Sequence, residues 1–374
     1  MLPYVLLIVV PMLFCYVGLK QNDNGRKTVV IGKNGYNRVN SLCIPVFFTI
    51  LFLLLALRSK EIGRDLPNYE YIFNQYCRAS LSEILYSSNL YQTEKGFMVL
   101  NWLIGLISKD FQWYMAAMAA VTVIPVAKLY AEDRRHGFLK IILYVNMSIF
   151  IVLFSGLRQS VAIGMGAIAY KYVREQKLIP FLAVCGIAMT MHHSSFMLFP
   201  MYFLYHMTWK KKHLLFVIPV IVAVFVFNQQ IFGLMLALLP GEKYGDAFIT
   251  RTNAYGSLIL FALFALYCYI LPDETNMDEE TLGLRSFVLM AVALQCFAPL
   301  HALAMRLNYY YILFIPVAMA KVCTCVRLKY RKAAAFAEVI LVAFFVIEFL
   351  SGIYQSYMTG ISSLDTVPYI PFWK

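Results

Sequence analysis

The sequence predicts an all-α polytopic membrane protein with about 12 transmembrane helices and one further re-entrant or interfacial helix. The first observation is composition: 61% of the residues are hydrophobic and 14% are charged, whereas roughly 25% of a soluble domain is charged. The second is that apolar runs of about 14 to 20 residues, near the length that crosses a bilayer, recur along the chain. The third is that basic residues border these runs. Residues 1–374 are therefore expected to form a single integral-membrane domain.

The predicted spans follow the apolar runs in order. We expect them at residues 3–19, 42–57, 112–130, 139–155, 159–173, 178–191, 194–208, 214–232, 256–271, 286–300, 307–322 and 334–351. The first run lacks a basic segment and a small-residue cleavage site, so it is taken as a span and not as a signal peptide. Phe97–Ile107 is too short to cross. It is assigned to a re-entrant or interfacial helix inside a long external loop, residues 58–110.

Three apolar stretches are too long for one crossing and carry polar residues at mid-length. They comprise residues 140–171, 177–210 and 285–321. If each is a helical hairpin, its two basic ends share the inner face, as the positive-inside rule favours. This topology places 21 of the 32 lysines and arginines inside, and both termini outside. Because the arms are short, the polar hairpin tips are expected in a recessed cavity of the outer face.

Charge and cysteine usage argue against several classes of function. The formal net charge is +12, but the basic residues lie beside apolar runs, so no nucleic-acid partner is expected. The eight cysteines lie mostly inside apolar runs, so we expect no disulfide. The chain has no Gly-rich phosphate loop and no plausible metal-ligand set, so neither a nucleotide, a metal nor another cofactor is expected.

Four arginines are candidate ligands for an anion at the outer face. Arg158 is an isolated charge in a long apolar stretch, and an arginine at a helix centre costs about 2.5–3.5 kcal/mol on insertion scales. Arg306 has the corresponding position in the third hairpin, and Arg58 and Arg251 lie in external loops. Guanidinium groups bind phosphate oxygens bidentately and stay charged. A membrane-embedded diphosphate is therefore the natural candidate ligand.

Two carboxylates and a histidine are candidates for proton transfer. Asp65 and Glu94 lie near the ends of apolar helices, and His192 lies at the tip of the second hairpin. The alternatives are structural: either carboxylate could be a solvated helix-end charge or the ion-pair partner of Arg158, and His192 could be a hydrogen-bonded structural residue. The adjacent His193 would point about 100° away on a helix, so the two histidines make a poor metal pair.

Six short segments together resemble a known family. They are Arg58 with Gly63, Asp65 and Tyr69; Tyr91 with Glu94, Gly96 and Phe97; Leu157-Arg158-Gln159; His192-x-Ser194; Arg306 with Tyr309 and Tyr310; and Val367-Pro368-Tyr369. In this order they resemble the motifs of EpsG-type, Wzy-like polysaccharide polymerases. The sequence departs from that pattern at residues 64 and 66, in one extra residue before Glu94, and in its doubled histidine.

The resemblance implies a GT-C-like glycosyltransferase of the bacterial inner membrane with its site on the periplasmic or extracellular side. Such an enzyme transfers a growing glycan from undecaprenyl diphosphate to a lipid-linked oligosaccharide repeat unit. We expect no metal in this reaction, because the sequence offers no plausible ligand set, and a direct displacement would invert the anomeric centre. The implied partners are undecaprenyl-diphosphate-linked oligosaccharide, membrane lipid and a chain-length regulator.

In such a mechanism the candidate residues take three roles. The arginines, led by Arg158 and Arg306, would stabilise the charge that develops on the leaving lipid diphosphate. Asp65, Glu94 and His192, in that order, are candidates for the general base. The sugar-stacking candidates, which could equally be interfacial belt residues, are Tyr69, Tyr91 and Tyr309.

Three rival functions remain open. An O-antigen ligase would use the same donor and a lipid A core as acceptor. A flippase for lipid-linked oligosaccharide would need charges along a mid-membrane pathway and an inverted repeat, neither of which the sequence shows. A membrane acyltransferase could use His192 and Ser194, but its donor side is usually cytoplasmic.

Overall fold

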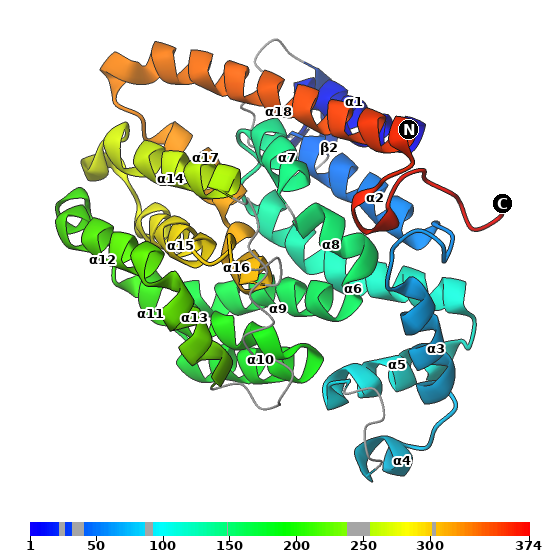
Figure 1. Ribbon diagram of the computed structural model, residues 1–374. Helices are drawn as coiled ribbons and strands as arrows, with labels where there is room; N and C mark the ends of the chain where they lie inside the picture. Colours follow the sequence, from blue (N-terminus) through cyan, green and yellow to red (C-terminus); the bar gives the residue numbers. More distant parts are fainter. Residues whose placement is uncertain (22–26, 32–40, 87–92, 148, 238–254, 301–303) are drawn as a thin grey trace. The chain divides into compact units, whose positions relative to one another are not determined.

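The computed structural model describes residues 1–374 except 22–26, 32–40, 87–92, 148, 238–254 and 301–303. The described residues are mostly helical (Figure 1). The chain divides into two compact units, one formed by Met1–Phe196 with Phe336–Lys374 and the other by Met197–Ala335. The expectation of a single membrane domain stays a prediction.

The first unit contains the amino-terminal helices, a small hairpin and most of the last helix. Its elements are α1 (Leu2–Leu13), η1 (Phe14–Tyr16), β1 (Val17–Gln21), β2 (Lys27–Ile31), α2 (Cys43–Ala56), α3 (Leu66–Tyr76), α4 (Leu81–Tyr86), α5 (Lys95–Ile107), α6 (Phe111–Glu132), α7 (Gly137–Asn146), α8 (Ile149–Ser155), α9 (Leu157–Arg174), α10 (Leu178–Met191), α18 (Arg331–Thr359) and η8 (Ser363–Asp365).

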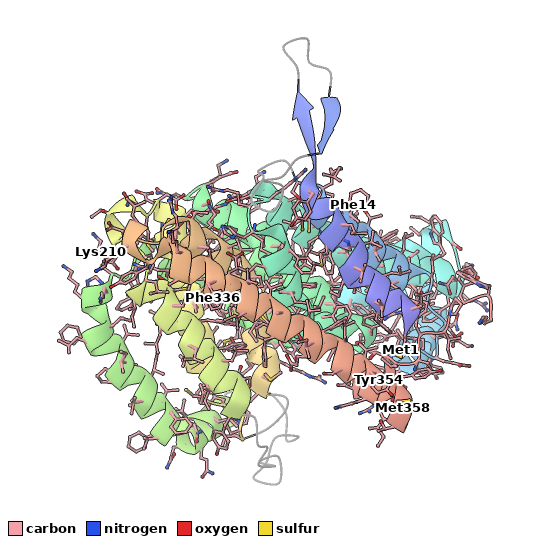
Figure 2. All side chains as sticks on the ribbon, turned by 90° about the horizontal axis from the view of Figure 1, so that it is seen from above. Met1, Phe14, Lys210, Phe336, Tyr354 and Met358 are labelled. Carbon is pink, nitrogen blue, oxygen red and sulfur yellow. The ribbon has the colours of Figure 1, made fainter. Side chains whose placement is uncertain are left out.

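The mostly helical structure agrees with the predicted all-α fold, and one short two-stranded sheet is an exception to it. β1 and β2 pair antiparallel, with Val17 opposite Ile31, and the hairpin extends away from the Phe14 end of α1 (Figure 2). The prediction of a span over residues 3–19 is therefore wrong at its end, because the helical part stops at Tyr16. The reason is local: residues 28–31 are all β-branched, which favours a strand, and Asp-Asn-Gly at 23–25 is a typical hairpin-turn composition.

The helices of the first unit pack in a continuous series. α1 packs on α2, α2 on α6, α6 on α9, and α9 on α10. Between α2, α6 and α7, the rings of Phe48, Tyr130 and Tyr144 make edge-to-face pairs with centroids 5.5 to 5.8 Å apart. Such aromatic geometry adds about 0.5–1.5 kcal/mol per pair beyond area burial. This core supports α9, whose first turn carries Arg158.

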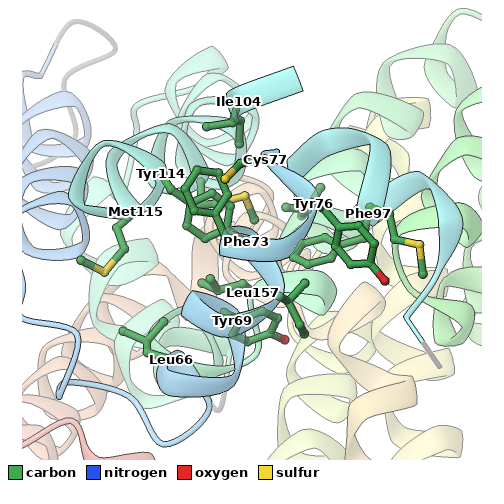
Figure 3. Close-up of a cluster of buried hydrophobic side chains, with 14 of the residues drawn as sticks. Leu66, Tyr69, Phe73, Tyr76, Cys77, Phe97, Ile104, Tyr114, Met115 and Leu157 are labelled. Atoms are coloured by element: carbon green, nitrogen blue, oxygen red, sulfur yellow. The ribbon is translucent and has the colours of Figure 1, made fainter. Parts of the chain in front are cut away.

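The predicted long external loop, residues 58–110, is largely helical. It contains α3, α4 and α5, and α5 begins two residues before the predicted Phe97–Ile107 helix. α3 and α5 pack on each other and on α6, and their apolar side chains form one buried cluster with the start of α9 (Figure 3). Within it, the rings of Phe73 and Tyr114 stack with centroids 4.4 Å apart. α3 and α4 were not expected from the sequence.

The last helix, α18, is held against α7 and α8 by polar and aromatic contacts. Glu338 Oε1 lies 2.8 Å from His136 Nδ1, and Asn146 donates a side-chain hydrogen bond to the carbonyl of Phe345 at 3.1 Å. The rings of Phe150 and Phe349 lie 5.8 Å apart. Large apolar side chains on other faces of α18 are exposed, as in a helix that contacts lipid.

Among the described residues of the second unit, all the helices and strands assigned are helices. Its elements are α11 (Pro200–His206), η4 (Lys211–His213), α12 (Leu214–Val226), α13 (Asn228–Ala237), α14 (Tyr255–Ile270), η6 (Glu274–Asn276), α15 (Glu279–Gln295), α16 (Ala304–Ile312), α17 (Ile315–Thr324) and η7 (Leu328–Tyr330). α15 packs on α16 and α17. Asn308 donates to the carbonyl of Ala291 at 2.8 Å and to Gln295 Oε1 at 2.9 Å. The two arms of the third predicted hairpin are thus in contact.

Helix length and composition identify fewer membrane-crossing helices than the apolar runs predict. Within the described residues, three are long and apolar enough: Phe111–Glu132, Ala304–Thr324 and Leu328–Thr359. The number rises to five if two sharply bent helix pairs, α7 with α8 and α12 with α13, each count as one span. Other predicted spans, such as Leu178–Met191, coincide with shorter apolar helices. The figure of about 12 spans is not confirmed and stays a prediction.

Candidate functional site

A buried carboxylate, Glu94, joins three segments of the first unit. Its side chain is 4% exposed, and Oε2 accepts a hydrogen bond from Arg158 Nη1 at 2.7 Å. Oε1 lies 3.1 Å from His192 Nδ1 and also accepts the backbone N–H of His193 at 3.2 Å. The structure thus brings together three of the predicted site residues. The ion pair considered for Arg158 is present, and its partner is Glu94.

Each of these three side chains lies at the end of a helix. Glu94 directly precedes α5, Arg158 is the second residue of α9, and His192 directly follows α10. Helix amino-termini carry partial positive charge, which favours a carboxylate before α5. α10 packs on both α5 and α9, so the three helix ends meet at one place.

Gly96 allows α5 to approach α10 this closely. A Cβ at this position would lie 2.0 Å from Thr190 Oγ1 and 2.9 Å from the carbonyl oxygen of Thr190. Real Cβ atoms do not approach other atoms so closely, so only glycine fits here. Gly96 is two residues after Glu94, and Thr190 is two residues before His192. The contact between the helices therefore sets the distance between the carboxylate and the imidazole.

The electrostatic surroundings hold Glu94 in its ionised form. Burial raises its pKa, but the hydrogen bond from His192 and the charge of Arg158 lower it further, so that the pKa of Glu94 falls from 4.5 to about 2. An ionised carboxylate is an acceptor only, so the hydrogen on His192 Nδ1 is donated to Glu94. In neutral His192, Nε2 then carries the lone pair.

The second predicted carboxylate, Asp65, lies beside the same turn of α9. Ser155, the last residue of α8, donates to Asp65 Oδ2 at 2.8 Å and accepts the backbone N–H of Asp65 at 3.1 Å. Tyr69 is buried, and its hydroxyl lies 3.5 Å from the backbone nitrogen of Arg158. Asp65, which directly precedes α3, and Tyr69, on the first turn of α3, therefore flank the break between α8 and α9.

A second glycine fixes the approach of the Asp65 loop. Gly63 has φ +121°, and a Cβ there would lie 2.0 Å from the carbonyl oxygen of Phe154. Both features require glycine. Gly63 stands two residues before Asp65, so this contact positions Asp65 opposite Ser155.

The remaining predicted residues are distributed over the first unit, the second unit and the segments outside the described residues. Arg58 belongs to the first unit, but its side chain is buried over the ring of Phe154, 5.2 Å from the centroid, and does not join Glu94. Arg306, which is exposed, and Tyr309, which is buried, lie on α16 of the second unit. Tyr91 and Arg251 lie outside the described residues.

Sequence reasoning gave no role to two polar residues beside the site. Ser155 holds Asp65, and the buried Gln159 lies with its Nε2 3.4 Å from Ser194 Oγ. The sequence contains a signal for both residues, because they lie in the polar centre of the first predicted hairpin. The segments Leu157-Arg158-Gln159 and His192-x-Ser194, which are separate in sequence, are therefore in contact.

Comparison with known protein families shows to which family the chain belongs. The model of the EpsG family matches residues 41–366. The chain belongs to the EpsG family. No curated protein and no solved structure matches it. The matched residues of this EpsG-family protein include Asp65, Glu94, Arg158 and His192, whereas α1 and the β-hairpin lie before them. Membership and the apolar helices indicate a membrane protein with a polysaccharide-polymerase-like role, in a family that is generally glycosyltransferase-like.

In this EpsG-family protein the cluster suits anion binding and proton transfer. The Arg158 side chain is 30% exposed and that of His192 is 20% exposed, so a ligand can reach both. A guanidinium carries five N–H donors in one plane, and Glu94 engages Nη1. Glu94 and His192 could serve as metal ligands, but the charge of Arg158 at 2.7 Å from Glu94 opposes a bound cation.

Proposed function

We propose that this protein is a polysaccharide polymerase that transfers a growing glycan from undecaprenyl diphosphate to a lipid-linked oligosaccharide repeat unit. The observation that carries the proposal is the cluster of Glu94, Arg158 and His192. It combines a partly exposed arginine side chain, whose guanidinium is suited to a phosphate, with an imidazole held in one tautomer by a buried carboxylate. A glycosyl transfer from a diphosphate needs both kinds of group.

His192 is the general base of the proposed reaction. Its Nε2 accepts the proton of the acceptor hydroxyl, while Nδ1 stays hydrogen-bonded to Glu94, which stabilises the resulting imidazolium. Glu94 is unsuited to be the base, because a carboxylate whose pKa is about 2 holds a proton weakly. This assignment moves His192 ahead of the other two candidates, and leaves Asp65 as the second.

Arg158 stabilises the leaving group. The bond between the anomeric carbon and the phosphate oxygen breaks, and lipid diphosphate leaves with the electron pair. The acceptor oxygen forms the new bond to the same carbon from the opposite side, so the anomeric configuration inverts. Negative charge grows on the diphosphate during this step, and a fixed guanidinium offsets it without a metal. Arg306 is proposed as a further diphosphate ligand, with Arg58 and Arg251 as weaker candidates.

The proposed setting is the bacterial inner membrane, with the site on the periplasmic or extracellular face and a GT-C-like arrangement of spans. The positive-inside rule supports this orientation, because it places residues 58–110 and the tips that carry Arg158 and His192 on the outer face. Undecaprenyl-diphosphate-linked oligosaccharide, membrane lipid and a chain-length regulator are the proposed partners. Tyr69, Tyr91 and Tyr309 are proposed to stack on sugar rings.

The genetic test is deletion of the gene and complementation with wild type, Arg158→Ala or Arg174→Ala. Arg174 is a matched control, because it lies on the same helix in a partly exposed pair with Glu132, and such pairs contribute about 0–1 kcal/mol. We expect the deletion to remove the polymer ladder and leave single repeat units on the surface. Arg174→Ala should restore the ladder and Arg158→Ala should not.

Other outcomes identify other functions. Accumulation of undecaprenyl-linked units inside the cell would favour a flippase. Full-length polymer that stays on its lipid carrier would favour an O-antigen ligase. Either result would contradict the polymerase.

A further inference from the structure

The residues that follow α18 return along the loop that leads to Asp65. We name residues 362–372 the C-terminal strap. Ser59 donates its backbone N–H to the carbonyl of Ile370 at 2.8 Å, and Phe372 donates to the carbonyl of Leu57 at 3.0 Å. Further along, the N–H of Gly63 and the N–H of Arg64 donate to the strap at 3.1 and 3.0 Å. The loop and the strap thus run side by side from residue 57 to residue 64.

Side chains add to this pairing. Tyr369 donates its hydroxyl to the carbonyl of Leu54 at 3.1 Å, which anchors the strap on α2. The hydroxyl of Tyr4 donates to the carbonyl of Thr366, which anchors it on α1. Beneath it, the Arg58 side chain is 2% exposed. The strap is therefore fixed to residues 57–64 by backbone hydrogen bonds and to α1 and α2 by side chains.

The backbone of the strap is in a conformation that needs support. Leu364 and Asp365 have φ +53° and +54°, in the left-handed region that residues other than glycine rarely adopt. Their carbonyl oxygens are the acceptors for Arg64 and Gly63. The strained conformation therefore places two acceptors where the Asp65 loop needs them.

We propose that the C-terminal strap is a positioning element of the site, which holds residues 58–65 so that Asp65 meets Ser155 at the break before Arg158. This inference rests on the proposed function for its catalytic consequence. The strap accepts hydrogen bonds from Gly63 and Arg64, and Asp65 directly follows them. Asp65 in turn is hydrogen-bonded to Ser155, which lies three residues before Arg158. The strap also packs directly on α8 through η8. Its residues are positioning residues and do not touch substrate.

A pair of variants at one residue separates conformation from charge. Asp365→Gly and Asp365→Val both remove the exposed ion pair with Arg64, whose side chains are 60% and 55% exposed and which contributes about 0–1 kcal/mol. Glycine adopts a positive φ without strain, whereas the β-branched valine does not. We expect Asp365→Gly to keep the polymer ladder and Asp365→Val to lose most of it at equal membrane abundance.

A second measurement does not depend on activity. A cysteine introduced as Asp65→Cys is labelled with a maleimide in permeabilised membranes, and labelling at that position is quantified by peptide mass spectrometry. We expect slow labelling with the native strap and with Asp365→Gly, and several-fold faster labelling with Asp365→Val. Equal labelling of the two variants would overturn the proposal, and so would equal ladders in cells where wild type makes polymer. If wild type made no polymer, the proposed function would have failed, and the labelling rates alone would decide whether the strap positions residue 65.

Discussion

At the residue scale, we propose that Glu94 organises the candidate site and does not act on the substrate. Its two oxygens are occupied by Arg158, His192 and the backbone of His193. The interactions orient a guanidinium and fix a tautomer at once. A carboxylate that accepts three hydrogen bonds is a weak base, because these bonds stabilise its ionised form.

Glu94→Gln tests this role. Glutamine keeps the shape of the glutamate side chain but has no charge. Its NH₂ group replaces one of the two carboxylate oxygens, so either Arg158 or the donors of His192 and His193 lose their acceptor. We expect polymer formation to fall by about 10²-fold or more, the scale of general acid–base contributions. Lipid-linked products of the variant and of wild type would be compared at equal protein amounts. A variant with wild-type activity would contradict the role of Glu94.

The stability of the protein should depend on pH through the same residue. The pKa of Glu94 is about 2 in the folded chain and 4.5 in its unperturbed state. A lowered pKa means that the ionised group stabilises the fold fully above pH 4.5 and that this contribution is lost as the pH falls toward 2. In thermal unfolding in detergent, the Tm difference between wild type and Glu94→Gln should shrink as the pH falls from 4.5 toward 2. A difference that is independent of pH would contradict the assigned shift.

The sequence identified these residues but not their pairing. Arg158 stood out because a lone charge in an apolar stretch needs an anion. Asp65 and Glu94 are equal candidates for the ion-pair partner of Arg158, since both lie near helix ends in one external segment. The choice depends on the packing of α5 against α10, which no local pattern encodes. The burial of Arg58 under the C-terminal strap is likewise a long-range effect.

At the element scale, the contact between α5 and α10 is the feature that assembles the site. Gly96→Ala should force the helices apart and cost about 1–3 kcal/mol, as overpacking usually does. Because Glu94 and His192 each lie two residues from this contact, activity should fall more than stability does.

Gly186→Ala is the matched control for Gly96→Ala. It lies on α10 with no atom within 4 Å of the added Cβ, so it should keep both activity and Tm. The comparison needs polymer ladders and melting temperatures for the two variants. Equal behaviour of both would show that the close contact is not required.

Hydrophobic runs located most helices of this chain. The span predicted at 178–191 has the bounds of α10, and the span at 42–57 differs from α2 by one residue at each end. The runs missed α3 and α4, because these are amphipathic helices of a polar segment and their apolar faces are covered by α5 and α6. They also missed the β-hairpin, whose apolar first strand continues the run of α1.

At the scale of the whole molecule, orientation in the membrane is the main open prediction. The positive-inside rule places residues 58–110 outside and the basic segment 321–332 inside. Cysteines introduced as Tyr86→Cys and Lys329→Cys occupy exposed positions in these two segments. A membrane-impermeant maleimide should label the first in intact cells and the second only after permeabilisation. The reverse pattern would invert the proposed topology.

The number of crossings was harder to predict than the helices themselves. Many apolar helices here have only 10 to 17 residues, whereas about 20 are needed to cross straight through hydrocarbon. Bent pairs such as α12 with α13 extend a run without extending a helix. Composition therefore identifies a membrane protein. The number of membrane spans depends on where each break between two helices lies in the bilayer.

The central claim, that this chain joins lipid-linked repeat units by means of Arg158, Glu94 and His192, is tested most directly with purified protein. Wild type and Arg158→Ala would each be incubated with undecaprenyl-diphosphate-linked repeat units, and the lipid-linked glycans and released undecaprenyl diphosphate quantified. We predict that wild type forms products in whole multiples of the repeat, releases one lipid diphosphate for each new linkage, and that Arg158→Ala does neither. Single units left unchanged by wild type, or the same products from Arg158→Ala, would contradict the account.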